Sequence, residues 1–81
     1  MKVKIYITLK EGVLDPQGKA IEHALKGLKF EDVRDVRQGK LIELYLADTD
    51  VRSARARVTD MCEKLLANTV IENYDIQISG S

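Results

Sequence analysis

The 81 residues of this chain include only one cysteine, Cys62, so no disulfide can form within a monomer. A chain this short buries only about 60% of the surface that its unfolded form exposes, and disulfides, a metal or association often supply the missing stability. One histidine and one cysteine do not make a structural zinc set. The sequence therefore predicts one small domain that associates with other chains, in a reducing compartment.

The charged residues balance, because thirteen lysines and arginines are matched by thirteen aspartates and glutamates. A nucleic-acid binder normally carries a basic surplus that displaces counterions from phosphates, so the composition disfavours a nucleic-acid partner. No apolar run approaches the roughly 20 residues that span a bilayer, and the N-terminus alternates like a strand instead of resembling a signal peptide. We therefore expect a soluble, cytoplasmic protein with no membrane partner.

The first third of the chain predicts a strand followed by a helix. Every second position near the start is apolar: Val3, Ile5, Ile7 and Leu9. Such alternation is typical of a strand with one face in a core. Asp15 can cap free backbone N–H groups and Pro16 suits the first helical position, so a helix is expected to begin here. Its apolar side chains share one face: Ala20, Ile21, Ala24, Leu25 and Leu28.

The middle of the chain fits two interpretations. Residues 41–46 alternate as a short strand, whereas residues 33–36 break the alternation. A turn at Gln38-Gly39 favours a hairpin, and one long strand over residues 33–46, bent by a bulge at Gly39, is the alternative.

The last third predicts a second helix and a final strand. Residues 48–50, Asp-Thr-Asp, offer caps for the helix, and Asn68 is expected to end it in the left-handed conformation. Residues 74–78 alternate as a strand, so we expect one domain over residues 1–78 and a disordered tail at 79–81. The helix has the strongest periodic apolar stripe of the chain: Val51, Ala54, Val58, Met61, Cys62, Leu65 and Leu66.

This order of elements predicts an α+β fold of the β-α-β-β-α-β, ferredoxin-like type, with two helices on one face of an antiparallel sheet. The other face would be uncovered, and its side chains include Tyr6, Thr8, Leu41 and Tyr45. A fully solvated face is usually more polar, so we expect these residues to form a self-association face. Tyrosines exposed without any partner are the alternative, since isolated apolar groups are common on protein surfaces.

The chain offers few groups for catalysis. His23 lies on the polar side of the first helix, and Cys62 lies within the apolar stripe of the second, so neither is placed as a nucleophile or base. Residues 10–18 have a lysine, two glycines and a helix start, which could hold a phosphate. Asp15 and Pro16 oppose this, because one places a carboxylate there and the other removes a donor. We predict no catalytic, metal or cofactor site.

Three motifs in order resemble the PurS family, the small subunits of phosphoribosylformylglycinamidine synthase. Residues 9–18 read Leu-Lys-Glu-Gly-Val-Leu-Asp-Pro-Gln-Gly, and residues 36–40 read Val-Arg-Gln-Gly-Lys. Residues 61–68 read Met-Cys-Glu-Lys-Leu-Leu-Ala-Asn, followed by Val-Ile-Glu at 70–72. The family usually has proline at the position of Thr69, and its absence here bears on the rigidity of that turn.

The resemblance implies a non-catalytic subunit that assembles the glutaminase PurQ with the ATP-dependent synthase PurL, so that ammonia passes between them. It also implies a dimer or higher oligomer in purine biosynthesis. Since loops carry recognition, we expect partner contacts at the motif positions without an expected core role: Lys10, Gly12, Asp15, Gln17, Arg37 and Lys40.

Two other functions share parts of this pattern. ACT-type regulatory modules have the same order of elements and bind amino acids at a dimer interface. An RNA-binding domain is disfavoured by the balanced charge and by the lack of an aromatic stacking platform. Without the resemblance, the residues alone predict only an α+β domain that associates.

Overall fold

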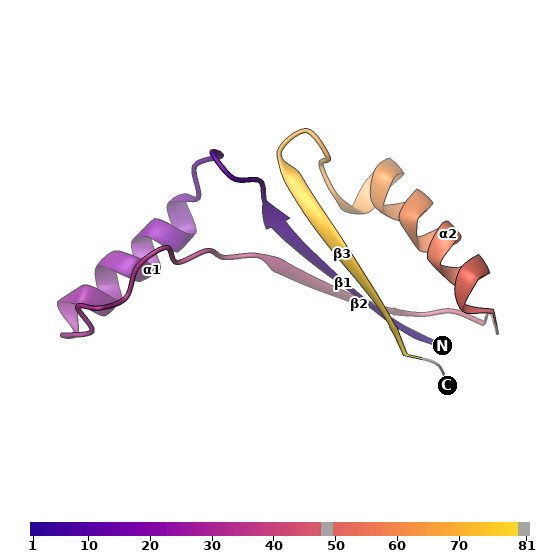
Figure 1. Ribbon diagram of the computed structural model, residues 1–81, viewed down its shortest axis with the longest axis horizontal. Coiled ribbons are helices and arrows are strands. Elements are labelled where there is room, and N and C mark those ends of the chain that lie inside the picture. The colour runs from indigo at the N-terminus through magenta and orange to yellow at the C-terminus, as the bar shows by residue number, and fades with distance from the viewer. Residues whose placement is uncertain (48–49, 80–81) are drawn as a thin grey trace.

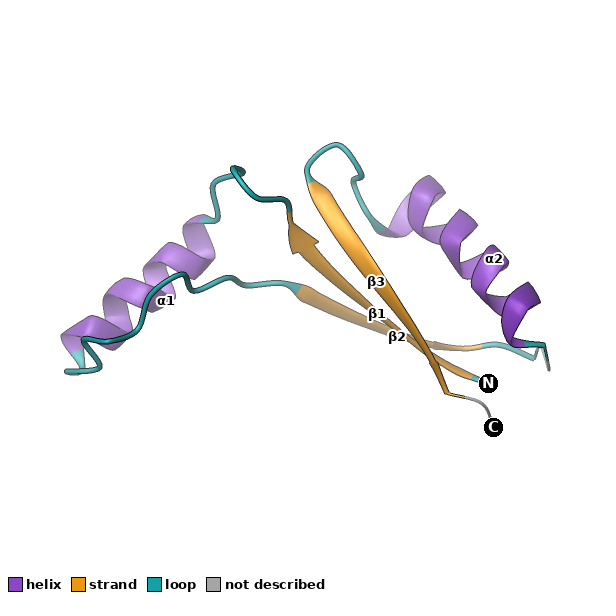
Figure 2. Ribbon diagram, viewed as in Figure 1, coloured by secondary structure: helices purple, strands orange, loops and turns teal. Residues whose placement is uncertain are grey.

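The computed structural model describes residues 1–47 and 50–79 of the chain, which form a three-stranded antiparallel sheet and two helices (Figures 1 and 2). The strands are ordered β2-β1-β3 in the sheet. A short π-helical segment, η1, extends the second helix. In chain order the elements are β1 (Lys2–Leu9), α1 (Pro16–Gly27), β2 (Lys40–Tyr45), α2 (Val51–Met61), η1 (Cys62–Leu66) and β3 (Glu72–Ser79).

The core lies between the sheet and α2. Strand β1 is central, and its residue Ile5 stands opposite Ile42 of β2 and Ile76 of β3. Because directly opposed residues share a face, the alternating apolar positions of all three strands form one inner face, which α2 covers in part. Burying each aliphatic side chain contributes roughly 1.5–3 kcal/mol. The largest fully buried side chains are Val3, Ile5, Ile7, Val58 and Cys62.

Helix α1 does not pack on this sheet, although we expected both helices on one face. Together with residues 28–39, which run back beside it, α1 forms an arm that projects from the sheet (Figure 1). The radius of gyration is therefore 16.0 Å, against about 12 Å for a compact domain of this length. The α+β class and the antiparallel sheet are confirmed, whereas α1 occupies a different place.

Only the second half of the expected hairpin forms a strand. Residues 33–39 pair with no strand, so neither the hairpin nor a long bent strand over 33–46 is formed. Asp35 has φ of 58°, a left-handed conformation that interrupts extended backbone. The backbone of this segment bonds to α1 instead: the amide of Val36 donates to Glu22 at 3.4 Å.

The ends of the second helix agree with the sequence in part. Asp50 caps α2 by accepting from the amide of Arg52 at 3.1 Å, while residues 48–49 lie outside the described residues. Asn68 does not adopt the expected left-handed conformation. The helix widens into η1 before it ends, and the Asn68 side chain accepts from the amide of Val70 at 3.2 Å, a local turn that replaces the cap.

Strand β3 includes Ser79, which we expected to begin the tail, and residues 80–81 lie outside the described part of the chain. Among the described residues, each helix is too short and too polar to traverse a bilayer.

Candidate partner interface

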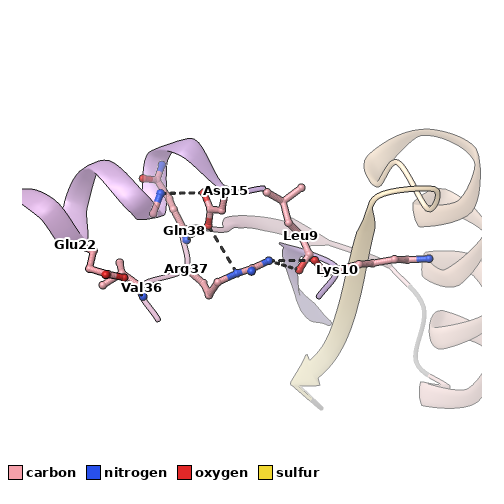
Figure 3. Close-up of polar contacts among 8 residues, drawn as sticks. Leu9, Lys10, Asp15, Glu22, Val36, Arg37 and Gln38 are labelled. Atoms are coloured by element: carbon pink, nitrogen blue, oxygen red, sulfur yellow. Dashed lines mark hydrogen bonds and ion pairs between the residues drawn. The ribbon is translucent and has the colours of Figure 1, made fainter. Parts of the chain in front are cut away.

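The carboxylate of Asp15 joins the start of α1 to the end of the arm. It accepts from the amide of Gly18 at 2.9 Å and from the amide of Gln38 at 2.8 Å, and it lies 3.8 Å from the Arg37 guanidinium (Figure 3). Asp15 is only 6% exposed. The backbone bond from Gln38, then that from Gly18 and the charge of Arg37, hold the pKa of Asp15 below its ordinary value. We call these four residues the clasp.

Arg37 connects the clasp to the sheet. Its guanidinium donates to the carbonyl oxygen of Leu9 at 2.9 Å and to that of Lys10 at 3.2 Å, immediately after β1 (Figure 3). Charged donors make stronger bonds than neutral ones. The two chain segments that lead into and out of the arm are therefore fixed to each other at its base.

Two glycines of the motif are required by the backbone around the clasp. A Cβ on Gly18 would stand 2.4 Å from the carbonyl oxygen of Val36 and 2.7 Å from the Asp15 carboxylate, so no larger side chain fits without movement. Gly12 has φ of 82°, a conformation that costs other residues energy. The Asp-Pro-Gln-Gly helix start therefore has a structural explanation in this clasp.

The structure brings the six expected contact residues to one end of the sheet, in two groups. Gly12, Asp15 and Arg37 set the backbone, although we had expected all three as partner contacts without a core role, and Asp15 also as a helix cap. Lys10, Gln17 and Lys40 remain as contact candidates. An open groove of about 350 Å³ is lined by Asp15, Gln17, Lys40 and Glu72 among others, and Lys10 lines a separate one beside Glu63 and Tyr74.

These contact candidates differ in how firmly they are held. The Lys40 ammonium lies 3.7 Å from the Glu72 carboxylate and is 70% exposed, so this ion pair adds little stability. The amide of Lys10 donates to the carbonyl oxygen of Ile71 at 2.8 Å, which ties the loop after β1 to the loop before β3. The side chain of Lys10 points away from the clasp (Figure 3).

The face of the sheet opposite α2 carries the residues expected to self-associate. Tyr6 stands opposite Leu41, and Lys2 stands opposite Tyr45, which places all of these on one face with Thr8. Tyr45 is 73% exposed and Leu41 is 51% exposed. Their common placement agrees with the sequence pattern, and the association remains a prediction.

The exposed apolar side of α1 was not anticipated from the sequence. Ile21 is 40% exposed and Leu28 is 67% exposed, and Ala24 lies between them on the same side. The helical periodicity was visible, but we assigned the whole apolar face to the protein's own core. The side of the helix at Gly18 and Glu22 lies against Val36 of the arm's returning segment.

Outside the clasp, Cys62 and His23 occupy places typical of structural and surface residues. Burial raises the pKa of the Cys62 thiol, which lies in the core under α2. His23 lies on the exposed side of α1. Within residues 1–47 and 50–79, no three His, Cys, Asp or Glu side chains gather as metal ligands would. The described residues therefore present surfaces for contact and one fixed carboxylate. This carboxylate belongs to Asp15, and its bonds are made within the clasp.

Comparison with known proteins shows similarity along nearly the whole chain. Residues 2–80 match the family model described as PurS: Phosphoribosylformylglycinamidine (FGAM) synthase. The phosphoribosylformylglycinamidine synthase subunit PurS of Bacillus subtilis is 53% identical over 77 residues, which are 95% of this chain and 90% of that protein.

Solved structures are also similar over nearly the whole chain. The crystal structure of Methanocaldococcus jannaschii PurS, a subunit of formylglycinamide ribonucleotide amidotransferase, aligns with a TM-score of 0.89 at 38% identity, covering 99% of this chain and 96% of that one. A chain in the structure of PurLQS from Thermotoga maritima aligns with a TM-score of 0.86 at 34% identity, covering 94% and 93%.

Proposed function

This chain belongs to the PurS family of phosphoribosylformylglycinamidine synthase subunits, and we propose that it joins PurL and PurQ in one complex. The observation that carries the proposal is structural: 94% of this chain aligns with a chain in the Thermotoga maritima PurLQS structure. Family membership over residues 2–80 also replaces the ACT-type alternative. The described side chains, which present surfaces and no assembled reactive group, are consistent with a bridging role.

A bridging subunit can promote the reaction without touching the substrate. Ammonia in water at neutral pH is mostly protonated and is then no nucleophile, so it must pass from PurQ to PurL without entering solvent. Holding the two enzymes together raises the effective concentration of one site at the other. Covering their junction excludes water from the path. This chain's contribution is therefore to position and to shield.

The partner contacts proposed for this role lie around the clasp. Lys10, Gln17 and Lys40 present polar groups at the base of the arm, where loops from β1, α1 and β3 meet. Asp15 and Arg37 act as positioning residues, because their bonds fix the loops that present those groups. Gly12 permits the turn that leads from the end of β1 to Asp15.

Self-association is a second part of the proposal. Tyr6, Thr8, Leu41 and Tyr45 form a partly apolar outer face, and a sheet face of this composition is usually covered. The small core gives a reason for association, since a domain of this size is only marginally stable alone. We place the complex in the cytoplasm, where purine biosynthesis and a reduced lone thiol are both expected.

Synthase activity measured with and without this chain tests the proposal. PurL and PurQ are assayed with glutamine and, separately, with ammonium salt as the nitrogen source. We expect omission of the chain to abolish the glutamine-dependent reaction and to leave most of the ammonia-dependent reaction. Equal glutamine-dependent rates with and without the chain would overturn the bridging function.

A matched pair of variants tests the contact residues. Lys10→Glu should weaken the capture of PurL and PurQ in a pull-down, because it reverses the charge of a proposed contact. Lys29→Glu, on an exposed residue just after α1 and away from the clasp, is the control and should be captured like the unaltered chain. Equal capture of both variants would remove Lys10 from the interface.

A further inference from the structure

The chain between α2 and β3 carries two exposed apolar side chains. Leu65 of η1 is 83% exposed and Val70 of the following turn is 81% exposed, the highest values among the large apolar residues of the described chain. Both lie in the motif at residues 61–72, which supplies none of the contacts proposed from the motifs at 9–18 and 36–40. Two apolar groups of this motif therefore have no role in the core.

The π-helical segment turns Leu65 outward. The apolar stripe of the sequence predicts Leu65 in the core, three residues after Cys62. In η1 the amide of Ala67 donates to the carbonyl oxygen of Cys62 at 3.1 Å, so the turn is wider than an α-helical one. Leu66 and Ala67 then follow Cys62 onto the core, and Leu65 faces solvent. Wide turns of this kind are frequent at functional sites.

The turn that presents Val70 is fixed by its own bonds. The amides of Ile71 and Glu72 donate to the carbonyl oxygen of Asn68 at 3.0 and 2.7 Å, and the amide of Val70 donates to the Asn68 side chain at 3.2 Å. The Glu72 carboxylate accepts in return from the amide of Asn68 at 2.6 Å. A side chain on a fixed backbone costs little conformational entropy to bind, so this turn suits a contact residue.

The turn adjoins the polar contact candidates at the same end of the sheet (Figure 1). The amide of Lys10 donates to the carbonyl oxygen of Ile71 at 2.8 Å, and the Lys40 ammonium lies 3.7 Å from the Glu72 carboxylate. Lys10 and Glu63 of η1 line one open groove of about 350 Å³. Apolar groups beside a polar rim are the usual anatomy of a protein interface. The turn and the base of the arm therefore form one continuous surface.

The grooves of this chain do not suit such projecting apolar groups. Those described on residues 1–47 and 50–79 are lined in part by charged side chains, which include Lys4, Lys19 and Glu63. Covering these charges with an apolar group would cost free energy, because charges are expensive to remove from water. A second copy therefore offers no matching recess in its described grooves, which favours a different protein as the occupant.

We propose that Leu65 and Val70 form an apolar anchor that inserts into an apolar recess of PurL. The inference rests on the proposed bridging function and adds the surface through which it is exerted. PurL is the subunit in which ammonia is consumed, and an apolar contact excludes water beside it. Lasting subunit contacts are also more apolar than transient ones, which fits a chain that remains part of the synthase.

Matched lysine substitutions test the anchor. Val70→Lys and Leu65→Lys each place a charge on the anchor, whereas Val51→Lys places the same charge on an exposed valine at the opposite end of α2. We expect the two anchor variants to bind PurL roughly tenfold more weakly or worse, and Val51→Lys to bind like the unaltered chain. Titration of each variant into fluorescently labelled PurL, with PurQ present, measures this. Unchanged affinity for both anchor variants would overturn the proposal.

Two further measurements separate docking from folding and from self-association. The melting temperature of Val70→Lys should match that of the unaltered chain, because the side chain is mostly exposed. Its mass in analytical ultracentrifugation should also be unaltered. A reduced oligomeric mass would place the turn in a contact between copies of this chain and would contradict the anchor on PurL.

Cross-linking identifies the occupant of the anchor. The complete complex is assembled with Val70→Cys that carries a photo-activated maleimide. The native Cys62 is buried, so unaltered chains treated in the same way are the control for its labelling. We expect a product that joins this chain to PurL. A product with PurQ or with a second copy in its place would show that another surface receives the turn, and the proposal would fail.

The cross-link distinguishes this inference from the bridging function. If glutamine-dependent activity never depends on the chain, the bridging function fails, and the cross-link still shows whether the turn contacts PurL. If the activity depends on the chain but the product contains PurQ, the bridging function stands and the anchor on PurL is overturned.

Discussion

Different forces stabilise the two regions of this molecule. One region is the body, which is the sheet with α2, and the other is the arm that carries α1. The body has an apolar core in which Ile5, Val58 and Cys62 are completely buried. The arm is joined to it by polar bonds, chiefly those of Asp15 and Arg37. Both helices are amphipathic in sequence, so amphipathicity alone does not decide whether a helix joins the core of its own chain. The connecting segments decide it.

The largest effect should come from a cavity in the body. We expect Ile5→Ala to lower the free energy of unfolding by about 2–5 kcal/mol, because the side chain is fully buried at the centre of the sheet. Leu41→Ala on the outer face, a matched control, should change it by less than about 0.5 kcal/mol in the monomer. Urea denaturation measures both. Similar losses for the two variants would show that the outer face is also covered.

A smaller effect is expected at the clasp. Gly18→Ala places a Cβ 2.4 Å from the carbonyl oxygen of Val36, and such overpacking costs roughly 1–3 kcal/mol. Gly27→Ala is the control, since nothing lies within 4 Å of its Cβ and alanine favours a helix by roughly 0.5–1 kcal/mol. Hydrogen exchange should quicken in the arm for Gly18→Ala only. Faster exchange in β1 as well would mean that arm and body unfold together.

The two regions should respond to opposite ends of the pH scale. The pKa of Asp15 is lowered by its backbone bonds, so its contribution is present above its unfolded value of 3.8 and is lost as the pH falls through the lower folded value. Burial raises the pKa of Cys62, so the body loses stability as the pH rises above that thiol's unfolded value of 9.0.

Amide exchange followed by NMR separates these two responses. The amides of Gly18 and Gln38 should lose protection below about pH 4, where Asp15 begins to be protonated in the unfolded chain. The amides of β1 should remain protected at this acid pH, and their protection should decrease at alkaline pH. Simultaneous loss of protection in both regions at acid pH would contradict their separate stabilisation.

The smallest effect should be a gain in stability that is confined to the body. The amide of Ile71 donates to the carbonyl oxygen of Asn68 at 3.0 Å, which places Thr69 at the second position of a turn, where proline fits well. Thr69→Pro should therefore raise the melting temperature, with a gain of about 0.4–1 kcal/mol from the stiffer unfolded chain. Exchange in the arm should not change. A lowered melting temperature would show that this turn cannot accept proline.

The sequence motifs pointed to segments that the fold brings together, while partner contact there stays a prediction. The motif at residues 9–18 and Arg37 meet in one place, as recognition loops would. The structural duty of Asp15 was predicted only as a helix cap. Its bond to Gln38 joins residues 23 positions apart, and no local pattern reports such a contact. The left-handed conformation of Asp35 was likewise not anticipated, because it accompanies the bonding of the returning segment to α1.

The sequence by itself determined the three strands that form, the two helices, the alternating core and the family. Those features depend on side chains a few residues apart, where period and capping act directly. The tertiary structure alone decided that α1 leaves the sheet and that residues 33–39 run beside it. Those outcomes depend on a buried carboxylate and a guanidinium that bond distant backbone groups, and such bonds exist only once the chain has folded.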